Sequence, residues 1–138
     1  MSQLSSRTRI ILDAALVNRL EALAGAAIRR APEAAYPLVH KLTSAKFVSG
    51  SRLPGNVVTI GSTVTYTDWL AGRKECRCLA WPEDARLSRG KLSILTPIGV
   101  ALLGLSSGDT TRWCSESGQE GLLTVELVTR AQLPFAVI

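Results

Sequence analysis

The chain has 138 residues, enough for one compact domain with an appended element, and a chain of this size can bury a core without disulfides or metals. Hydrophobic residues make up 46% of the chain and charged residues 20%, a balance that excludes a disordered chain. The formal net charge is +5, but the basic residues are scattered, so nucleic-acid binding is not indicated.

Apolar stretches are too short for a membrane protein. None approaches the ~20 residues that span a bilayer. The apolar run at residues 10–12 is also far shorter than the core of a signal peptide. We therefore expect a cytoplasmic protein with no membrane contact, and the odd number of cysteines, three, suits a reducing compartment.

The first fifty residues predict an antiparallel helical hairpin. Asp13 is a suitable N-cap for a helix with an apolar stripe, which ends between Leu23 and Arg30. Proline is accepted in the first turn of a helix, so a second helix is expected from near Pro37 to about Val48. Two short helices with facing apolar stripes form a hairpin, or short coiled coil.

The composition changes at the Ser49-Gly50-Ser51 join, which divides the chain into an N-terminal hairpin, residues 1–52, and a C-terminal domain, residues 53–138. β-Branched and alternating residues then predict strands at 57–60, 63–68, 74–81, 92–95, 110–114 and 122–130. Pro97 begins a short helix that Gly104 ends. The fold class is therefore α+β, with a short helix laid on an antiparallel sheet.

Catalytic and metal-binding signatures are missing from the sequence. The chain has one histidine, His40, which is expected on the solvent face of the second helix. Cys76 and Cys78 lie two apart in a strand, where packing explains them better than a zinc site. Nucleophile motifs and phosphate-binding glycine loops are absent. We expect no enzyme activity, no cofactor and no metal.

The densest motif is residues 92–109, Leu-Ser-Ile-Leu-Thr-Pro-Ile-Gly-Val-Ala-Leu-Leu-Gly-Leu-Ser-Ser-Gly-Asp. It predicts a strand, a proline-started helix, a glycine cap and a Gly-Asp turn. Most of its leucines must be core. The helix is apolar nearly all round, however, so some of Leu95, Ile98, Leu102 and Leu103 are expected to line an exposed patch that meets a partner.

This segment resembles the C-terminal domain of the bacterial Gre transcript-cleavage factors, which carry a Ser-Pro, a short helix and a Gly-Asp turn in the same order. Residues 57–64 resemble the strand that opens that domain, and residues 97–113 resemble still more closely the Rnk regulators of nucleoside diphosphate kinase, a branch of this family. The chain is therefore identified as a member of the Gre/Rnk family with a shortened hairpin.

The resemblance implies an FKBP-like C-terminal domain that binds RNA polymerase at the rim of its secondary channel, with the hairpin pointing into the channel and DNA contacted only through the polymerase. The residues carried over as polymerase-binding are Leu95, Thr96, Pro97, Leu102 and Leu103. This chain has Thr96 where the Gre factors usually have serine, and Leu95 where they often have aspartate. The protein is expected to act as a monomer.

The hairpin tip lacks the acidic residues with which Gre factors help the polymerase retain a catalytic Mg²⁺. It offers Arg29, Arg30 and a lone carboxylate, Glu33. Mg²⁺ prefers oxygen ligands, and two positive charges would repel it. A helix from Asp13 to about Ile28 spans only ~24 Å. We therefore expect competition with Gre factors at the channel mouth and no transcript cleavage.

Two other functions fit the sequence less well. An FKBP-like fold raises the possibility of a peptidyl-prolyl isomerase, but these enzymes use an aromatic pocket, and no aromatic cluster is evident here. The Rnk resemblance raises an interaction module acting on nucleoside diphosphate kinase, although nothing in the residues indicates contact with that kinase.

Overall fold

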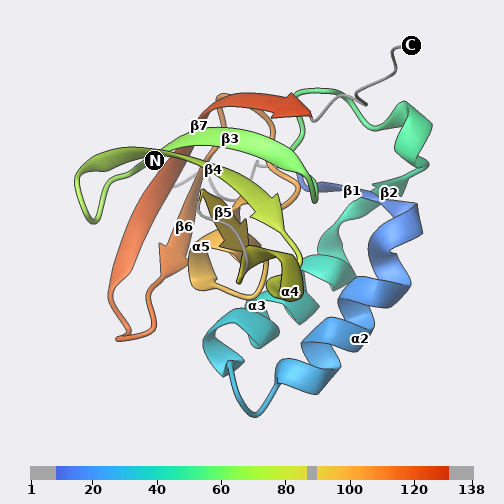
Figure 1. Cartoon of the computed structure of the whole chain (residues 1–138), viewed down its shortest axis with the longest axis horizontal. Coiled ribbons are helices and arrows are strands. Elements are labelled where there is room, and N and C mark those ends of the chain that lie inside the picture. Colours follow the sequence, from blue (N-terminus) through green and yellow to red (C-terminus); the bar gives the residue numbers. More distant parts are fainter. Residues whose placement is uncertain (1–8, 87–89, 131–138) are drawn as a thin grey trace.

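The computed structural model describes residues 9–86 and 90–130, so the ends of both predicted domains, 1–8 and 131–138, lie outside the described residues. Its elements follow in the order β1 (Ile11–Asp13), η1 (Ala14–Leu16), α2 (Val17–Ala27), α3 (Pro32–Ser44), β2 (Lys46–Val48), η2 (Gly50–Arg52), β3 (Ser62–Asp68), β4 (Arg73–Ala80), α4 (Pro82–Ala85), β5 (Lys91–Ser93), α5 (Pro97–Leu102), β6 (Thr110–Cys114) and β7 (Glu120–Arg130). Figure 1 shows the α2–α3 hairpin beside a curled sheet. The α+β class is confirmed.

The hairpin begins at its expected cap. The Asp13 carboxylate accepts a hydrogen bond from the backbone N–H of Ala15 at 2.9 Å, and a single 3₁₀ turn leads into α2. The helix continues through Gly25 to Ala27. The expected start of the second helix near Pro37 is wrong: α3 begins at Pro32, and Pro37 lies inside it.

The early start of α3 follows from its packing. Its buried residues, Ala34, Ala35, Leu38 and Leu42, include two that precede Pro37, and the helix packs against α2. Pro37 itself is exposed. A proline inside a helix loses a backbone hydrogen bond, but the helix continues through Pro37 with buried apolar residues on both sides of it.

The expected continuation of this helix to Val48 is also wrong. After Ser44 the backbone becomes extended, and β2 pairs in parallel with β1, with Ile11 opposite Lys46 and Asp13 opposite Val48. The backbone N–H of Lys46 donates to the Ile10 carbonyl at 2.9 Å. The β1–β2 pair therefore ties the two ends of the hairpin together at its base.

The main sheet has five strands in the order β5-β4-β3-β7-β6. Its pairs are antiparallel except β4–β5, which is parallel, so the expectation of a fully antiparallel sheet is corrected. Helix α4 lies in the connection between β4 and β5.

Residues 57–60 do not form the expected strand. Val57 makes only an isolated bridge to Ser106. The Val58 N–H donates to the Leu105 carbonyl at 2.8 Å, and the Gly104 N–H donates to the Val58 carbonyl at 2.9 Å. These valines are fully buried, so their β-branched side chains reflect core packing against the segment after α5 rather than a sheet position.

One hydrophobic core joins the hairpin to the sheet. Leu20 and Ala24 of α2 and Leu38 of α3 belong to the same buried cluster as Val100 of α5 and Val125 of β7. Helix α5 lies between α3 on one side and strands β6 and β7 on the other. In the parts of the chain that the structure describes, every helix is too short or too polar to cross a bilayer.

Candidate protein-interaction site

The N-terminus of α5 is built by a short network of hydrogen bonds. The Thr96 hydroxyl accepts from the Gly99 N–H at 3.0 Å and donates to the Ser93 carbonyl at 2.7 Å. The Ser93 hydroxyl accepts from the Leu95 N–H at 3.0 Å. Thr96 is thus the N-cap of α5, and Pro97, which has no N–H to satisfy, occupies the first helical position.

Gly99 is required in this turn by a close approach of backbone. A Cβ at this position would lie 2.2 Å from the Ser93 carbonyl oxygen, far inside any real contact distance. The sequence Ser93 to Gly99 therefore encodes a rigid corner that fixes the direction of the side chains around Pro97.

The outer surface of this corner forms an apolar ledge, which we define as Leu95, Thr96, Pro97 and Ile98. All of these residues are partly exposed. Beside them is a hollow of about 430 Å³, lined by Leu92, Thr96, Pro97, Ile98, Trp113, Ser115, Glu116 and Ser117. Its lining combines apolar side chains with polar ones from the β6–β7 turn, a combination typical of a protein-binding site.

Leu102 and Leu103 do not belong to this surface. They are 1% and 0% exposed, so the expectation that they line an exposed patch is wrong. The reason is that α5 is covered by α3 on one side and by the sheet on the other, and its last turn lies between them. Of the predicted polymerase-binding residues, the structure brings Leu95, Thr96 and Pro97 together at the surface.

A second hollow adjoins the ledge, between α3 and β6. Its volume is about 560 Å³, and it shares Pro97 and Trp113 with the first. Its wall carries charged and polar side chains, namely Glu33, His40, Lys41, Ser44, Thr111, Arg112 and Glu120. The two hollows meet at the Pro97–Trp113 pair.

Sequence reasoning missed Trp113 as a wall of both hollows. It lies opposite Gly121 in the β6–β7 pair, where a Cβ on Gly121 would approach the indole Nε1 to 3.1 Å. The absence of a side chain at Gly121 therefore makes room for the indole. The available signal was Trp113 in the predicted 110–114 strand together with Gly121, which directly precedes the predicted 122–130 strand.

Lys41 was also missed, because it follows the exposed His40. Its Nζ donates hydrogen bonds to the carbonyls of Val100 at 2.6 Å, Ala101 at 3.0 Å and Leu103 at 2.7 Å. Burial lowers the pKa of Lys41 from 10.5 to about 7, whereas the three carbonyls favour the ammonium form. The signal was its spacing, three residues after the buried Leu38 on the same helix face.

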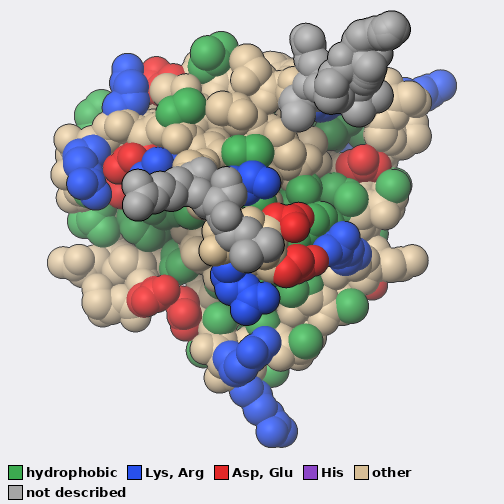
Figure 2. All heavy atoms as spheres, viewed as in Figure 1, with side chains coloured by type: hydrophobic (Ala, Val, Ile, Leu, Met, Phe, Trp, Pro, Cys, Tyr) green, Lys and Arg blue, Asp and Glu red, His purple; other side chains and the backbone are tan. Residues whose placement is uncertain are grey.

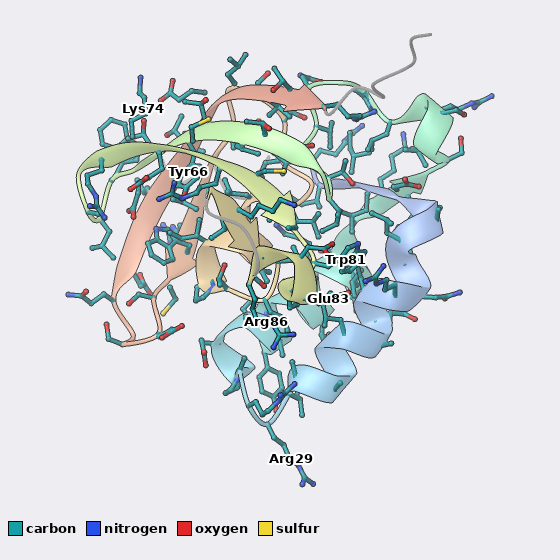
Figure 3. All side chains as sticks on the ribbon, in the orientation of Figure 1. Arg29, Tyr66, Lys74, Trp81, Glu83 and Arg86 are labelled. Atoms are coloured by element: carbon teal, nitrogen blue, oxygen red, sulfur yellow. The ribbon has the colours of Figure 1, made fainter. Side chains whose placement is uncertain are left out.

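The predicted tip residues divide between two places. Arg29 and Arg30 are exposed in the turn between α2 and α3, and Figure 3 shows Arg29 pointing away from the body of the molecule. Figure 2 shows basic side chains at this end. Glu33 instead lies in the first turn of α3 and lines the 560 Å³ hollow.

The other reactive side chains in residues 9–86 and 90–130 are one histidine and three cysteines. His40 is exposed on α3, as expected. Cys76 and Cys114 are exposed, Cys78 is partly buried, and all are free thiols. Within these residues no group of three or more His, Cys, Asp or Glu side chains could hold a metal ion.

Comparisons with known proteins extend these observations. Residues 53–130, which include the ledge, match the family described as transcription elongation factor, GreA/GreB, C-term. The regulator of nucleoside diphosphate kinase of Escherichia coli K12 is 36% identical over 73 residues, 53% of this chain and 54% of that protein. The transcription elongation factor GreA of Hyphomonas neptunium is 28% identical over 88 residues, 64% of this chain and 56% of that protein.

The fold is also similar to a solved structure. A prokaryotic transcription elongation factor GreA/GreB from Nitrosomonas europaea has a TM-score of 0.68 and 32% sequence identity, over 88% of this chain and 99% of that chain. The chain spans only 54% and 56% of the length of the two curated relatives described above. The family match covers more than half of the chain, so the resemblance seen in the sequence is confirmed: the chain belongs to the GreA/GreB family of transcription elongation factors.

Proposed function

We propose that this protein regulates transcription by binding RNA polymerase through the apolar ledge at the start of α5, at the rim of the secondary channel. The observation that carries the proposal is the family match over residues 53–130, within which Leu95, Pro97 and Ile98 stay partly exposed beside a hollow. Apolar side chains held open on a rigid corner favour a protein partner, because their burial on binding stabilises a complex.

The ledge suits a helical element of the partner. The lining of the hollow beside Pro97 includes the apolar side chains of Leu92, Ile98 and Trp113 and the carboxylate of Glu116. A helix could place one or two apolar side chains in it and meet the rim with polar groups. We propose that residues 53–138 form an FKBP-like domain whose partner is a coiled coil of the polymerase, and that residues 1–52 form a hairpin unit that packs on this domain through the shared core.

The hairpin would occupy the mouth of the channel without reaching its end. Helix α2 has 11 residues and so a length of ~16 Å, to which the preceding 3₁₀ turn adds ~6 Å. The exposed tip carries Arg29 and Arg30, whereas Glu33 faces the hollow beside α3. A tip that offers only the lone carboxylate of Glu33 beside two arginines is poorly suited to hold Mg²⁺, so we propose that the protein excludes longer channel factors and does not stimulate transcript cleavage.

We also propose where the protein acts, in what oligomeric state, and that it is not an enzyme. The protein acts in the cytoplasm as a monomer, reaches DNA only through the polymerase, and is not an enzyme. A peptidyl-prolyl isomerase would need an aromatic pocket, and the two hollows beside the ledge contain one aromatic side chain, Trp113.

A transcript-cleavage assay on backtracked polymerase complexes tests this function. We expect no cleavage from this protein alone and a concentration-dependent loss of the cleavage stimulated by an added Gre factor. An Ile98→Asp variant, which places a charge on the ledge, should lose that inhibition, while Leu127→Ser, on an exposed site that lines neither hollow, should keep it. Robust cleavage by the protein alone, or inhibition that both variants retain, would contradict the proposal.

A further inference from the structure

Lys41 links the N-terminal hairpin to the C-terminal domain through hydrogen bonds to α5. It belongs to α3 of the hairpin, and its ammonium group contacts the last turn of α5 in the C-terminal domain. An ammonium has three N–H donors, and here each finds a backbone carbonyl, at 2.6, 3.0 and 2.7 Å. The carbonyls at a helix C-terminus otherwise lack partners within the helix. Lys41 therefore supplies hydrogen-bond donors to the end of α5 and at the same time links α5 to α3.

No other charge accounts for this position. The ion pairs among the described residues are Arg19–Glu83, Arg73–Glu75 and Arg77–Glu75, and Lys41 takes part in none of them. Glu33 and His40 line the same hollow from α3. The hydrogen bonds that Lys41 donates go to three backbone carbonyls in the last turn and C-cap of α5, which together define the direction of its ammonium group.

The other polar contacts between the hairpin and the C-terminal domain are either longer than the hydrogen bonds of Lys41 or made by side chains that are more exposed. The Ile11 N–H donates to the Gly104 carbonyl at 3.2 Å. The Arg19 guanidinium lies 3.9 Å from the centre of the Trp81 ring and pairs with Glu83, but the side chains of that pair are 55% and 54% exposed. Figure 3 shows Trp81 and Glu83 beside α2. Exposed ion pairs of this kind restrain orientation little.

Helix α5 therefore carries two functions at its two ends. Its first turn presents the ledge at Pro97, its last turn receives Lys41, and the whole helix has only six residues. We propose that Lys41 is a positioning residue that sets the direction of the hairpin relative to the ledge. Its role in aiming the hairpin at the channel mouth rests on the proposed function, whereas the fixed direction itself does not.

A distance measurement on the isolated protein tests the fixed direction. Spin labels placed by Arg29→Cys at the tip and Lys74→Cys on β4 lie at opposite ends of the molecule (Figure 3), in a background where Cys76, Cys78 and Cys114 are replaced by serine or alanine. Double electron–electron resonance should give one narrow distance distribution for the otherwise native protein. Lys41→Met should broaden that distribution by at least about twofold, and Lys41→Arg, which keeps donors for the carbonyls, should restore most of it.

The matched control is Lys46→Met, which removes an exposed lysine from β2 and should leave the distribution unchanged. A purely structural role of Lys41 would lower the melting temperature of Lys41→Met and leave the distance distribution of the folded protein as narrow as before; that result would overturn the proposal. Should Lys41→Met not fold, Lys41→Gln, which keeps two donors without the charge, decides the question by the same criterion.

A second experiment measures how the same variants bind and act on RNA polymerase. Lys41→Met should bind core RNA polymerase within about twofold of the native protein, because the ledge is intact, and should inhibit Gre-stimulated cleavage at least about fivefold less. If the native protein fails to bind polymerase, the proposed function falls while the distance result still stands. Unchanged inhibition by a variant whose distribution is broadened would show that hairpin direction does not matter, and would overturn the positioning role.

Discussion

Replacing Thr96 separates the chemical role of its hydroxyl from that of its methyl group. The hydroxyl caps α5 by accepting from the Gly99 N–H, and it donates to the Ser93 carbonyl. Thr96→Ser keeps both bonds, Thr96→Val keeps the shape and loses both, and Thr96→Ala loses the bonds and the methyl group. The two hydrogen bonds of the Thr96 hydroxyl give a physical reason for a hydroxyl residue at the N-cap of α5.

The expected magnitudes follow from the bonds that are lost. An N-cap hydroxyl contributes ~1 kcal/mol, and a net hydrogen bond ~0.5–1.5 kcal/mol. We therefore expect Thr96→Val and Thr96→Ala to lower the free energy of unfolding by about 1–2 kcal/mol, and Thr96→Ser by less than about 0.7 kcal/mol. At this chain length each kcal/mol lowers the melting temperature by roughly 3–5 °C.

Thermal and urea unfolding of the three variants measures these differences. Thr43→Ala is the matched control, because the Thr43 hydroxyl is exposed on α3 and donates only to the His40 carbonyl within its own helix. Its stability should change by less than about 0.5 kcal/mol. The capping role would be refuted if Thr96→Val were as stable as the native protein, or if Thr96→Ser were as unstable as Thr96→Val.

Other parts of the structure give further expected outcomes. Gly104→Ala should cost about 2 kcal/mol or more in urea unfolding, because Gly104 has a φ of +85° and a Cβ there would lie 2.5 Å from Ile10 Cγ2; a native-like stability would contradict this packing. Arg19→Ala, which loses the contacts with Trp81 and Glu83, should cost about 0.5–1.5 kcal/mol in the same assay, and an unchanged midpoint would show that they contribute nothing. Burial, and to a lesser degree the charge of the nearby Glu75, raises the pKa of the Tyr66 hydroxyl from 10.0 to about 12, so the folded state keeps a proton that the unfolded state releases. The free energy of unfolding should therefore fall between pH 10 and pH 12, and Tyr66→Phe should remove that part of the fall.

Local patterns predicted most of the sheet. The strand at Thr110–Cys114 has its expected bounds, and β3, β4 and β7 lie within one or two residues of theirs. These strands are bounded by glycine turns such as Gly72 and Gly118, whose positive φ angles only glycine adopts readily. Alternation and turn chemistry are encoded within a few residues, so the sequence alone reveals them.

Contacts between distant segments could not be predicted in this way. The pairing of β1 with β2 depends on a hairpin closing over more than thirty residues, and the 57–58 segment looks like a strand because it is buried against residues 104–105. Leu102 and Leu103 were expected at the surface because a short helix on a sheet should expose one side. The hairpin packs on that side and buries them. Lys41 has a partner only because of the same packing.

The ledge is the surface on which the account depends, and its affinity for core RNA polymerase tests that dependence most directly. A titration should compare the native protein, a Leu95→Ser/Ile98→Ser variant of the ledge, and Leu127→Ser, which is 56% exposed in the native protein and lines neither hollow. We expect the native protein and Leu127→Ser to bind equally, and the ledge variant to bind at least about tenfold more weakly, a loss of about 1.4 kcal/mol. Equal binding by all three proteins, or no binding by the native protein, would contradict the account.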